Sequence, residues 1–166
     1  MILKNDFKQV ERLVFSKCNF KYTVPLEEEE GFEYGAGTFK LNNFFIKLRS
    51  SKITPKKVGQ FVTLWKRNNE GITQPHSFSE PIDLVVINSR QDDLFGQFIF
   101  PTKVLEKHGI LSSDKSKGKR GFRVYPPWDE TTSFQASKTQ KWQLEFFLKV
   151  DDQTDIALAK SLYSGL

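Results

Sequence analysis

The chain has 166 residues, a formal net charge of +5 and 14% aromatic residues. This length predicts one domain with a buried core, and the aromatic content excludes a disordered protein. The single cysteine, Cys18, excludes an internal disulfide and a cysteine-based zinc site and is typical of a reducing compartment. Residues 1–8 lack the apolar segment of a signal peptide, and no segment has the apolar length of a membrane span. We therefore expect a cytoplasmic protein.

The N-terminal segment has the apolar spacing of an amphipathic helix. Apolar residues recur at helical intervals from Phe7 to Val14, and Asp6 is a candidate N-cap, so the pattern predicts a helix over 6–17. The acidic run 27–30 comes later in the chain. It could open a second helix, because carboxylates favour a helix N-terminus, or it could form a solvated loop.

A β-hairpin is predicted next, with strands over 38–41 and 44–49 joined by an Asn-Asn turn. Side chains alternate between the two faces of a strand. Lys47 and Arg49 are therefore expected side by side, on the face opposite the buried apolar residues of the second strand.

The remaining elements follow from short apolar runs and turn residues. Strands are predicted over 60–66, 83–88, 95–100 and 122–125, loops over 51–59, 68–81 and 114–121, and helices over 103–108, 132–148 and 151–166. Phe134 is expected on the buried side of the long helix. This order of elements predicts a single α/β or α+β domain over 1–166, with a central mixed sheet flanked by helices.

The stretch from 34 to 69 contains no Asp or Glu and carries eight cationic residues: Lys40, Lys47, Arg49, Lys52, Lys56, Lys57, Lys66 and Arg67. Aromatic residues lie between these cations. A folded surface usually mixes its charges, so a stretch of one sign over strand-like sequence indicates a surface for polyanions. The alternative is an ordinary solvated face whose aromatic residues belong to the core.

Basic and aromatic residues also alternate over 119–129, just before the longest predicted helix. Arg123 would bring charge to phosphate groups, and an exposed Tyr125 would offer a ring on which a base could stack. Gln135 and Gln143 lie two helical turns apart and could point to one side. We expect Arg123, Tyr125 and this helix face to line the same cleft as the basic stretch around Arg49.

Catalytic and metal-binding patterns are weak. Asp83 begins a predicted strand, as in the Mg²⁺ nuclease site of the PD-(D/E)xK kind, but the next strand offers Gln97 and Ile99 where that site needs a carboxylate and a lysine. We therefore predict no catalytic residue, no metal and no cofactor. The alternative is a migrated nuclease site in which Glu33 and Asp83 hold Mg²⁺ and Lys52 reaches its water.

Several segments, in order, resemble the signature of MepB-like proteins. They are 49–67 (RSSKITPKKVGQFVTLWKR), 96–101 (GQFIFP), 123–128 (RVYPPW), the glutamine-containing pairs at 135–136, 139–140 and 142–143, and Glu33-Tyr34 before Phe39. The resemblance spans about residues 5–150, and Ser51 stands where many members carry alanine. It implies a core similar to that of restriction endonucleases and a nucleic-acid-binding role. The family takes its name from an operon that also encodes a multidrug efflux pump.

We therefore expect a monomer that binds DNA or RNA with little sequence preference and without catalysis. Phosphate contacts would supply most of the affinity, and stacking would add about 1–3 kcal/mol per base. The candidate binding residues are Lys47, Arg49, Lys52, Lys56, Lys57, Lys66, Arg67, Arg123, Tyr125, Gln135 and Gln143. Besides the migrated nuclease, an accessory factor of multidrug resistance that meets an acidic protein remains an alternative.

Overall fold

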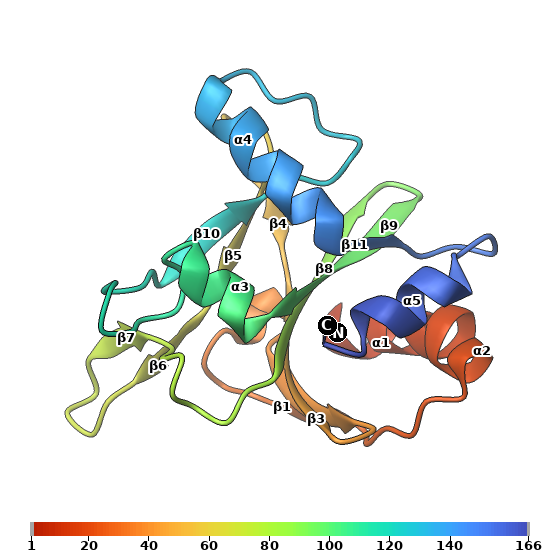
Figure 1. Cartoon of the computed structure of the whole chain (residues 1–166), viewed down its shortest axis with the longest axis horizontal. Coiled ribbons are helices and arrows are strands. Elements are labelled where there is room, and N and C mark those ends of the chain that lie inside the picture. The colour runs from red at the N-terminus through yellow and green to blue at the C-terminus, as the bar shows by residue number, and fades with distance from the viewer. Residues whose placement is uncertain (1, 166) are drawn as a thin grey trace.

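The computed structural model describes residues 2–165 and is built on one central sheet (Figure 1). Its six strands run in the order β1-β2-β3-β8-β9-β11. Their bounds are β1 Leu26–Glu27, β2 Gly37–Leu41, β3 Phe44–Ser50, β8 Leu84–Gln91, β9 Leu94–Pro101 and β11 Phe147–Lys149. β3 and β8 are parallel, whereas the other neighbouring pairs are antiparallel. The predicted mixed sheet and the β2–β3 hairpin are confirmed.

The central strands are buried on both faces because their apolar side chains alternate between two cores. In β8, Leu84 and Val86 join one core, whereas Val85 and Ile87 join the other. Such nearly continuous apolar runs are typical of strands covered on both sides. The two faces therefore carry different layers, which Figure 1 shows on either side of the sheet.

One face is covered by helices from the two ends of the chain. α1 Ile2–Val10 continues through a π-helical segment, Glu11–Phe15, into α2 Ser16–Cys18, and α5 Ile156–Leu162 lies beside them. Because the helix begins before Asp6, the prediction of Asp6 as an N-cap is wrong. Its buried carboxylate instead accepts hydrogen bonds from Ser50 and Arg90.

The other face carries the helix α3 Thr102–Lys107 and two small sheets. One small sheet has the order β10-β5-β4, and the other pairs β6 with β7. The bounds are β4 Lys52–Ile53, β5 Gln60–Thr63, β6 Trp65–Arg67, β7 Thr73–Pro75 and β10 Gly121–Val124. β7 lies within the segment predicted as a loop, because its polar sequence carries no strand pattern and only pairing with β6 makes it a strand.

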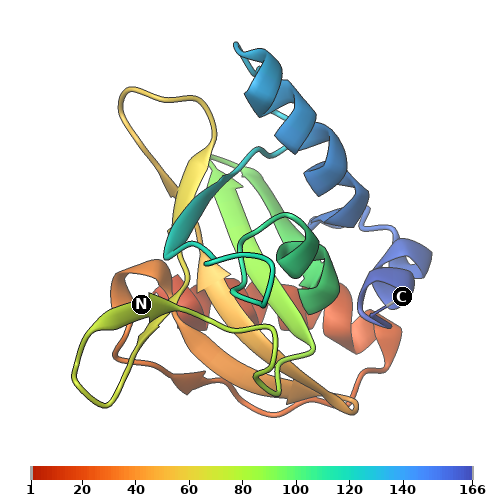
Figure 2. The ribbon, with the colours of Figure 1, turned by 60° about the vertical axis from the view of Figure 1, so that its left-hand side comes forward.

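The helix predicted over 132–148 ends early. α4 Phe134–Gln143 begins at Ser133, whose side chain accepts from the N–H of Ala136, and a 3₁₀ turn over Leu144–Phe146 follows. Residues predicted as the last helical turn form β11, because pairing with β9 completes the sheet edge. α4 rises away from the sheet (Figure 2). None of the helices within 2–165 has the length and apolarity needed to cross a membrane.

Candidate nucleic-acid interface

A groove of about 280 Å³ lies between β10 and α4. Its polar and aromatic lining includes His108, Lys119, Arg123, Tyr125, Gln135 and Trp142. Four predicted site residues, Arg123, Tyr125, Gln135 and Gln143, thus line one groove, which confirms the part of the cleft prediction that concerns them. The lining residues do not include Arg49, so its inclusion in that cleft is wrong.

Two glutamine side chains of α4 hold the backbone of the segment 123–129 beside this groove. Gln143 is fully buried, donates to the carbonyl of Arg123 and accepts from the N–H of Tyr125, each at 2.9 Å. Gln140 donates to the carbonyls of Pro126 and Asp129, at 2.9 and 3.0 Å. Gln143 therefore holds the backbone that carries Arg123 and Tyr125. The prediction that Gln143 contacts nucleic acid is wrong, because its buried amide is hydrogen-bonded to that backbone.

The groove continues over the loop 54–59. The guanidinium of Arg123 donates to Thr54 Oγ1 at 2.5 Å and to the carbonyl of Val58 at 3.2 Å. Gly59 has φ +85°, and a Cβ atom there would lie 2.7 Å from the Tyr125 ring, so only glycine permits this close approach. In Figure 2 the loop between β4 and β5 and helix α4 rise from the same end of the molecule.

A second hollow, of about 630 Å³, extends from Arg123 and Phe122 to Lys56 and Lys57. Both hollows are lined by Phe122 and Arg123, so they adjoin. Their lining includes four cationic side chains, Lys56, Lys57, Lys119 and Arg123, and no carboxylate among the described residues. A concave surface lined by one sign of charge concentrates ions of the opposite sign.

Aromatic rings lie between these charges. Phe61, Phe122, Tyr125 and Trp142 line the two hollows. The ring of His108 stacks on Trp142 with centroids 3.8 Å apart and an interplanar angle of 4°. Burial and the nearby Lys107 lower the pKa of His108, so the ring is neutral at pH 7.

Phe134 is the aromatic residue that sequence reasoning placed wrongly. It was expected on the buried side of the long helix, but its side chain is 85% exposed. It lies in the chain between Ser133 and Gln135, which both line the groove. The low apolar content of α4 was the available signal, because a helix that buries little has no core for this ring.

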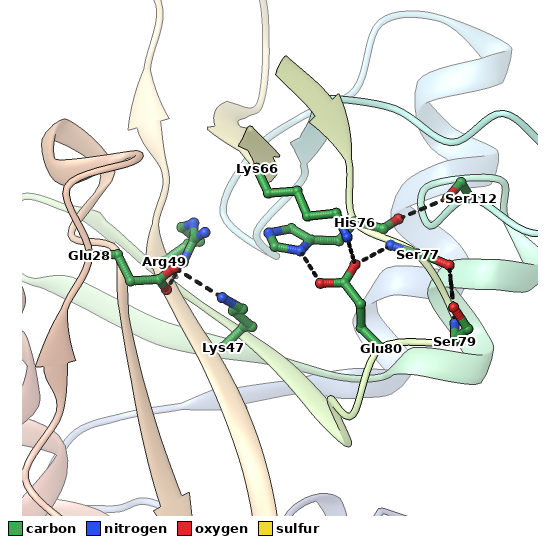
Figure 3. A network of polar contacts seen from close by, with 9 residues as sticks. All are labelled: Glu28, Lys47, Arg49, Lys66, His76, Ser77, Ser79, Glu80 and Ser112. Carbon is green, nitrogen blue, oxygen red and sulfur yellow. Dashed lines mark hydrogen bonds and ion pairs between the residues drawn. The ribbon is translucent and has the colours of Figure 1, made fainter. Parts of the chain in front are cut away.

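Lys47 and Arg49 do not form an open basic face. Lys47 Nζ lies 2.9 Å from Glu28 Oε2, and Arg49 Nη1 lies 3.1 Å from Glu28 Oε1 (Figure 3). The Arg49 side chain is only 1% exposed. The predicted alternation in β3 is confirmed, but the face opposite the apolar residues lies beneath the small sheets, so the prediction of Lys47 and Arg49 as an exposed pair is wrong.

Three further predicted cations are paired with carboxylates. Lys52 lies 3.7 Å from Glu33, Lys66 lies 3.0 Å from Glu80, and Arg67 lies 3.1 Å from Glu30. Most of these partners come from the acidic run and the residues just after it. The acidic run and the acid-free stretch, which are separate features of the sequence, therefore neutralise each other in the fold.

The two lysines of the loop 54–59 differ from those paired cations. Lys56 and Lys57 are exposed, and neither forms an ion pair with a carboxylate within residues 2–165. The prediction of one basic face shared by all the cations is therefore wrong. The cations divide into a paired group on β3, β4 and β6 and an unpaired group at the groove.

The migrated nuclease site is not formed. Asp83 Oδ2 accepts from the N–H of Phe45, at the beginning of β3, at 2.8 Å. Glu33 pairs with Lys52, which follows the end of β3. An extended strand rises roughly 3.3 Å per residue, so the two carboxylates lie at opposite ends of the strand and cannot share a metal ion. In the part of the chain that the structure describes, no three His, Cys, Asp or Glu side chains are grouped to hold one.

Gln97, which stands where a nuclease carboxylate would be, is part of the core. Its Oε1 accepts from the Tyr163 hydroxyl at 2.7 Å, and its Nε2 donates to Asn88 Oδ1 at 2.8 Å. A buried amide needs such partners, because an unpaired polar group in the core costs about 1–3 kcal/mol. Gln97 therefore links α5 to the sheet.

The chain was compared with known proteins. A family model described as MepB-like matches residues 28–149. Among solved structures, MepB matches with a TM-score of 0.76 and 36% identity, covering 78% of this chain and 87% of that chain. A bacterial homing endonuclease matches with a TM-score of 0.48 and 17% identity, covering 87% of this chain and 91% of that chain. No curated protein matches. The chain belongs to the MepB-like family.

Proposed function

We propose that this protein binds nucleic acid with little sequence preference, and does not cleave it, through the groove between β10 and α4 and its continuation over the loop 54–59. The observation that carries this proposal is the lining of the two hollows. It combines Lys56, Lys57, Lys119 and Arg123 with aromatic rings and includes no described carboxylate.

The charges would supply most of the binding free energy. A lysine or arginine that meets a phosphate releases condensed counterions, so the affinity depends steeply on salt. Arg123 is held by Thr54 and Val58 and presents its charge in a fixed position between the two hollows. Contacts to phosphate carry no sequence information, which accounts for the low preference that we propose.

The rings would add stacking. Every base has a π-face, so stacking on an aromatic side chain is tolerant of sequence and contributes about 1–3 kcal/mol per base. Tyr125 and the exposed Phe134 are the rings that a base could reach. Gln135, which also lines the groove, offers an amide that could contact a base edge.

The test is binding of labelled single- and double-stranded DNA and RNA, measured by fluorescence anisotropy at several salt concentrations. Lys56→Ala/Lys57→Ala should weaken binding about tenfold or more at low salt, a loss of about 1.4 kcal/mol. Lys4→Ala/Lys8→Ala on α1, across the sheet, removes the same charge and should change little. Equal losses in both double variants, with the fold intact, would refute the groove as the binding site.

The same assay separates the alternatives. A parallel sample with Mg²⁺, analysed for products, detects cleavage, and cleavage would refute the non-catalytic part of the proposal. Polyglutamate as competitor tests for an acidic protein partner. If polyglutamate displaces the oligonucleotide as effectively as unlabelled nucleic acid of equal charge, the groove recognises only the negative charge of its ligand. A role as an accessory factor of multidrug resistance would then become the better proposal.

A further inference from the structure

A second group of charged side chains lies between β3 and the small sheets (Figure 3), and none of its members lines the groove or the adjoining hollow. We call it the β3 charge cluster. Its members are Glu28, Lys47, Arg49, Lys66, His76 and Glu80. All are buried or partly buried, with side-chain exposures from 1% to 34%. Ionisable groups with perturbed pKa values that gather in one place are a recognised mark of a functional site.

The cluster has more cations than carboxylates. Burial alone would raise the pKa of both Glu28 and Glu80. Arg49 and Lys47 around Glu28, and the hydrogen-bond donors around Glu80, outweigh this and hold both pKa values below the usual range. Both carboxylates are therefore charged at pH 7. Three cations face two carboxylates, and uncompensated charge is costly away from water.

Two polar atoms in the cluster are buried and make no hydrogen bond within the described chain. They are Arg49 Nε and His76 Nε2, on side chains that are 1% and 3% exposed. Figure 3 shows the His76 ring with its Nε2 edge turned toward Arg49 and Lys47. An unpaired buried polar group costs about 1–3 kcal/mol, so such atoms call for a partner.

Gly31 lies beside one of these atoms. It has φ +82°, and a Cβ atom built there would lie 3.3 Å from Ala36 Cβ, 3.6 Å from Arg49 Nε and 3.8 Å from Thr63 Oγ1. A side chain at this position would therefore lie against the guanidinium.

We propose that the β3 charge cluster binds one small inorganic anion, held by Arg49 Nε–H, the Lys47 ammonium and an Nε2–H on His76. The anion supplies the negative charge that the two glutamates do not provide and gives both unpaired atoms a partner. The site shares no residue with the lining of the groove, so anion binding there does not require nucleic-acid binding.

His76 distinguishes an anion from a water molecule. Its Nδ1 lies 3.1 Å from Glu80 Oε1, and a carboxylate can only accept, so Nδ1 donates. Without an anion the ring is neutral and Nε2 is an acceptor, because burial lowers the pKa of His76 and the charges of Lys47 and Arg49 lower it further, against the opposing effect of Glu80. A bound anion reverses this balance and favours the imidazolium, in which Nε2 donates.

The test is ¹⁵N NMR of the two histidine rings, assigned with His76→Gln, over a pH titration in a zwitterionic buffer. Sodium phosphate or sodium chloride is added in one arm, and sodium gluconate of equal ionic strength in the other, because gluconate is too large to enter. The proposal requires the apparent pKa of His76 to rise by at least about one unit more in phosphate or chloride than in gluconate. Equal values in all three salts would refute it, since Nε2 then accepts from Arg49 directly or through water.

Two variants test the same site by thermal unfolding. An anion that binds the folded protein raises Tm with its concentration. Lys66→Gln removes the most exposed cation and should weaken the apparent anion affinity at least about tenfold, whereas Lys8→Gln on α1 should leave it unchanged. Arg49→Lys keeps the charge but removes Nε and should act like Lys66→Gln. A phosphate-dependent rise in Tm that persists in Lys66→Gln as in Lys8→Gln would contradict the proposal.

Discussion

The groove beside α4 and the β3 charge cluster use the same residue types in opposite ways. In the cluster, Lys47 and Arg49 are buried against Glu28. At the groove, Lys56 and Lys57 follow only a few residues later in the chain, yet they are exposed and their hollow has no described carboxylate in its lining. A run of like charge in a sequence therefore does not define a surface. The carboxylates that the fold brings to it decide which cations remain available.

The largest effect is expected from breaking the cluster. Arg49→Ala should lower the free energy of unfolding by about 3–5 kcal/mol, because it leaves Glu28 partly buried without its main partner. Urea denaturation measures the change. Arg67→Ala removes an exposed ion pair with Glu30 and should cost at most about 1 kcal/mol. Similar losses for both variants would mean that Arg49 does not differ from a surface residue.

The second-largest effect is expected from removing Gln143, which holds one wall of the groove. Gln143→Ala leaves the carbonyl of Arg123 and the N–H of Tyr125 unpaired. It should cost about 2–4 kcal/mol, since each such group costs about 1–3 kcal/mol, and it should also weaken oligonucleotide binding. Gln135→Ala is the matched control: its exposed amide should affect stability by no more than about 0.5 kcal/mol. Unchanged stability in Gln143→Ala would show that the wall does not need this side chain.

Stacking at the groove should have a smaller effect. Tyr125→Ala should weaken binding of a single-stranded oligonucleotide by about 1–3 kcal/mol, whereas Tyr125→Phe, which keeps the ring, should bind as the wild type does. Anisotropy titrations at one fixed salt concentration give the comparison. If both substitutions weaken binding equally, the hydroxyl rather than the ring makes the contact.

The pH dependence of stability should be the smallest effect. The pKa of His76 is lowered in the folded state, mainly by burial, so between this lowered pKa and the usual value of about 6.5 the unfolded chain binds more protons. Stability should therefore fall as the pH decreases through this range. Above about pH 6.5 the full contribution of neutral His76 to stability is present. Unfolding followed from pH 7.5 to 5 should show this slope reduced in His76→Gln. An identical slope in that variant would assign the effect to other groups, such as His108, whose pKa is also lowered.

Local patterns predicted much of the fold. The β2–β3 hairpin follows from alternation around Asn42, which has φ +53°, a conformation that asparagine tolerates. The apolar run of β8 indicated a strand covered on both faces, and Val85 and Ile87 do face a second core. These features depend on residues close together in the sequence, which is why periodicity identifies them.

Long-range partners account for the errors. Thr73–Pro75 is a strand only because β6 lies beside it, and Phe147 and Leu148 leave the helix because β9 offers an open edge. Part of the candidate site was identified for the same local reason as the hairpin, since Arg123 and Tyr125 are neighbours on one strand end. The burial of Arg49 could not be predicted, because its partner Glu28 lies in a segment whose sequence has no strand or helix periodicity.

The difference between unpaired and paired cations can be tested directly by one measurement. The salt dependence of oligonucleotide affinity should be compared for Lys56→Ala/Lys57→Ala at the groove and for Lys52→Ala/Arg67→Ala, whose side chains pair with Glu33 and Glu30. Both double variants remove the same charge. Because each lost phosphate contact lowers the slope of log K against log salt by about one, the first variant should lose about two and the second should keep the wild-type slope. A slope that falls in the second variant and stays unchanged in the first would show that the unpaired lysines of the groove do not contact phosphate.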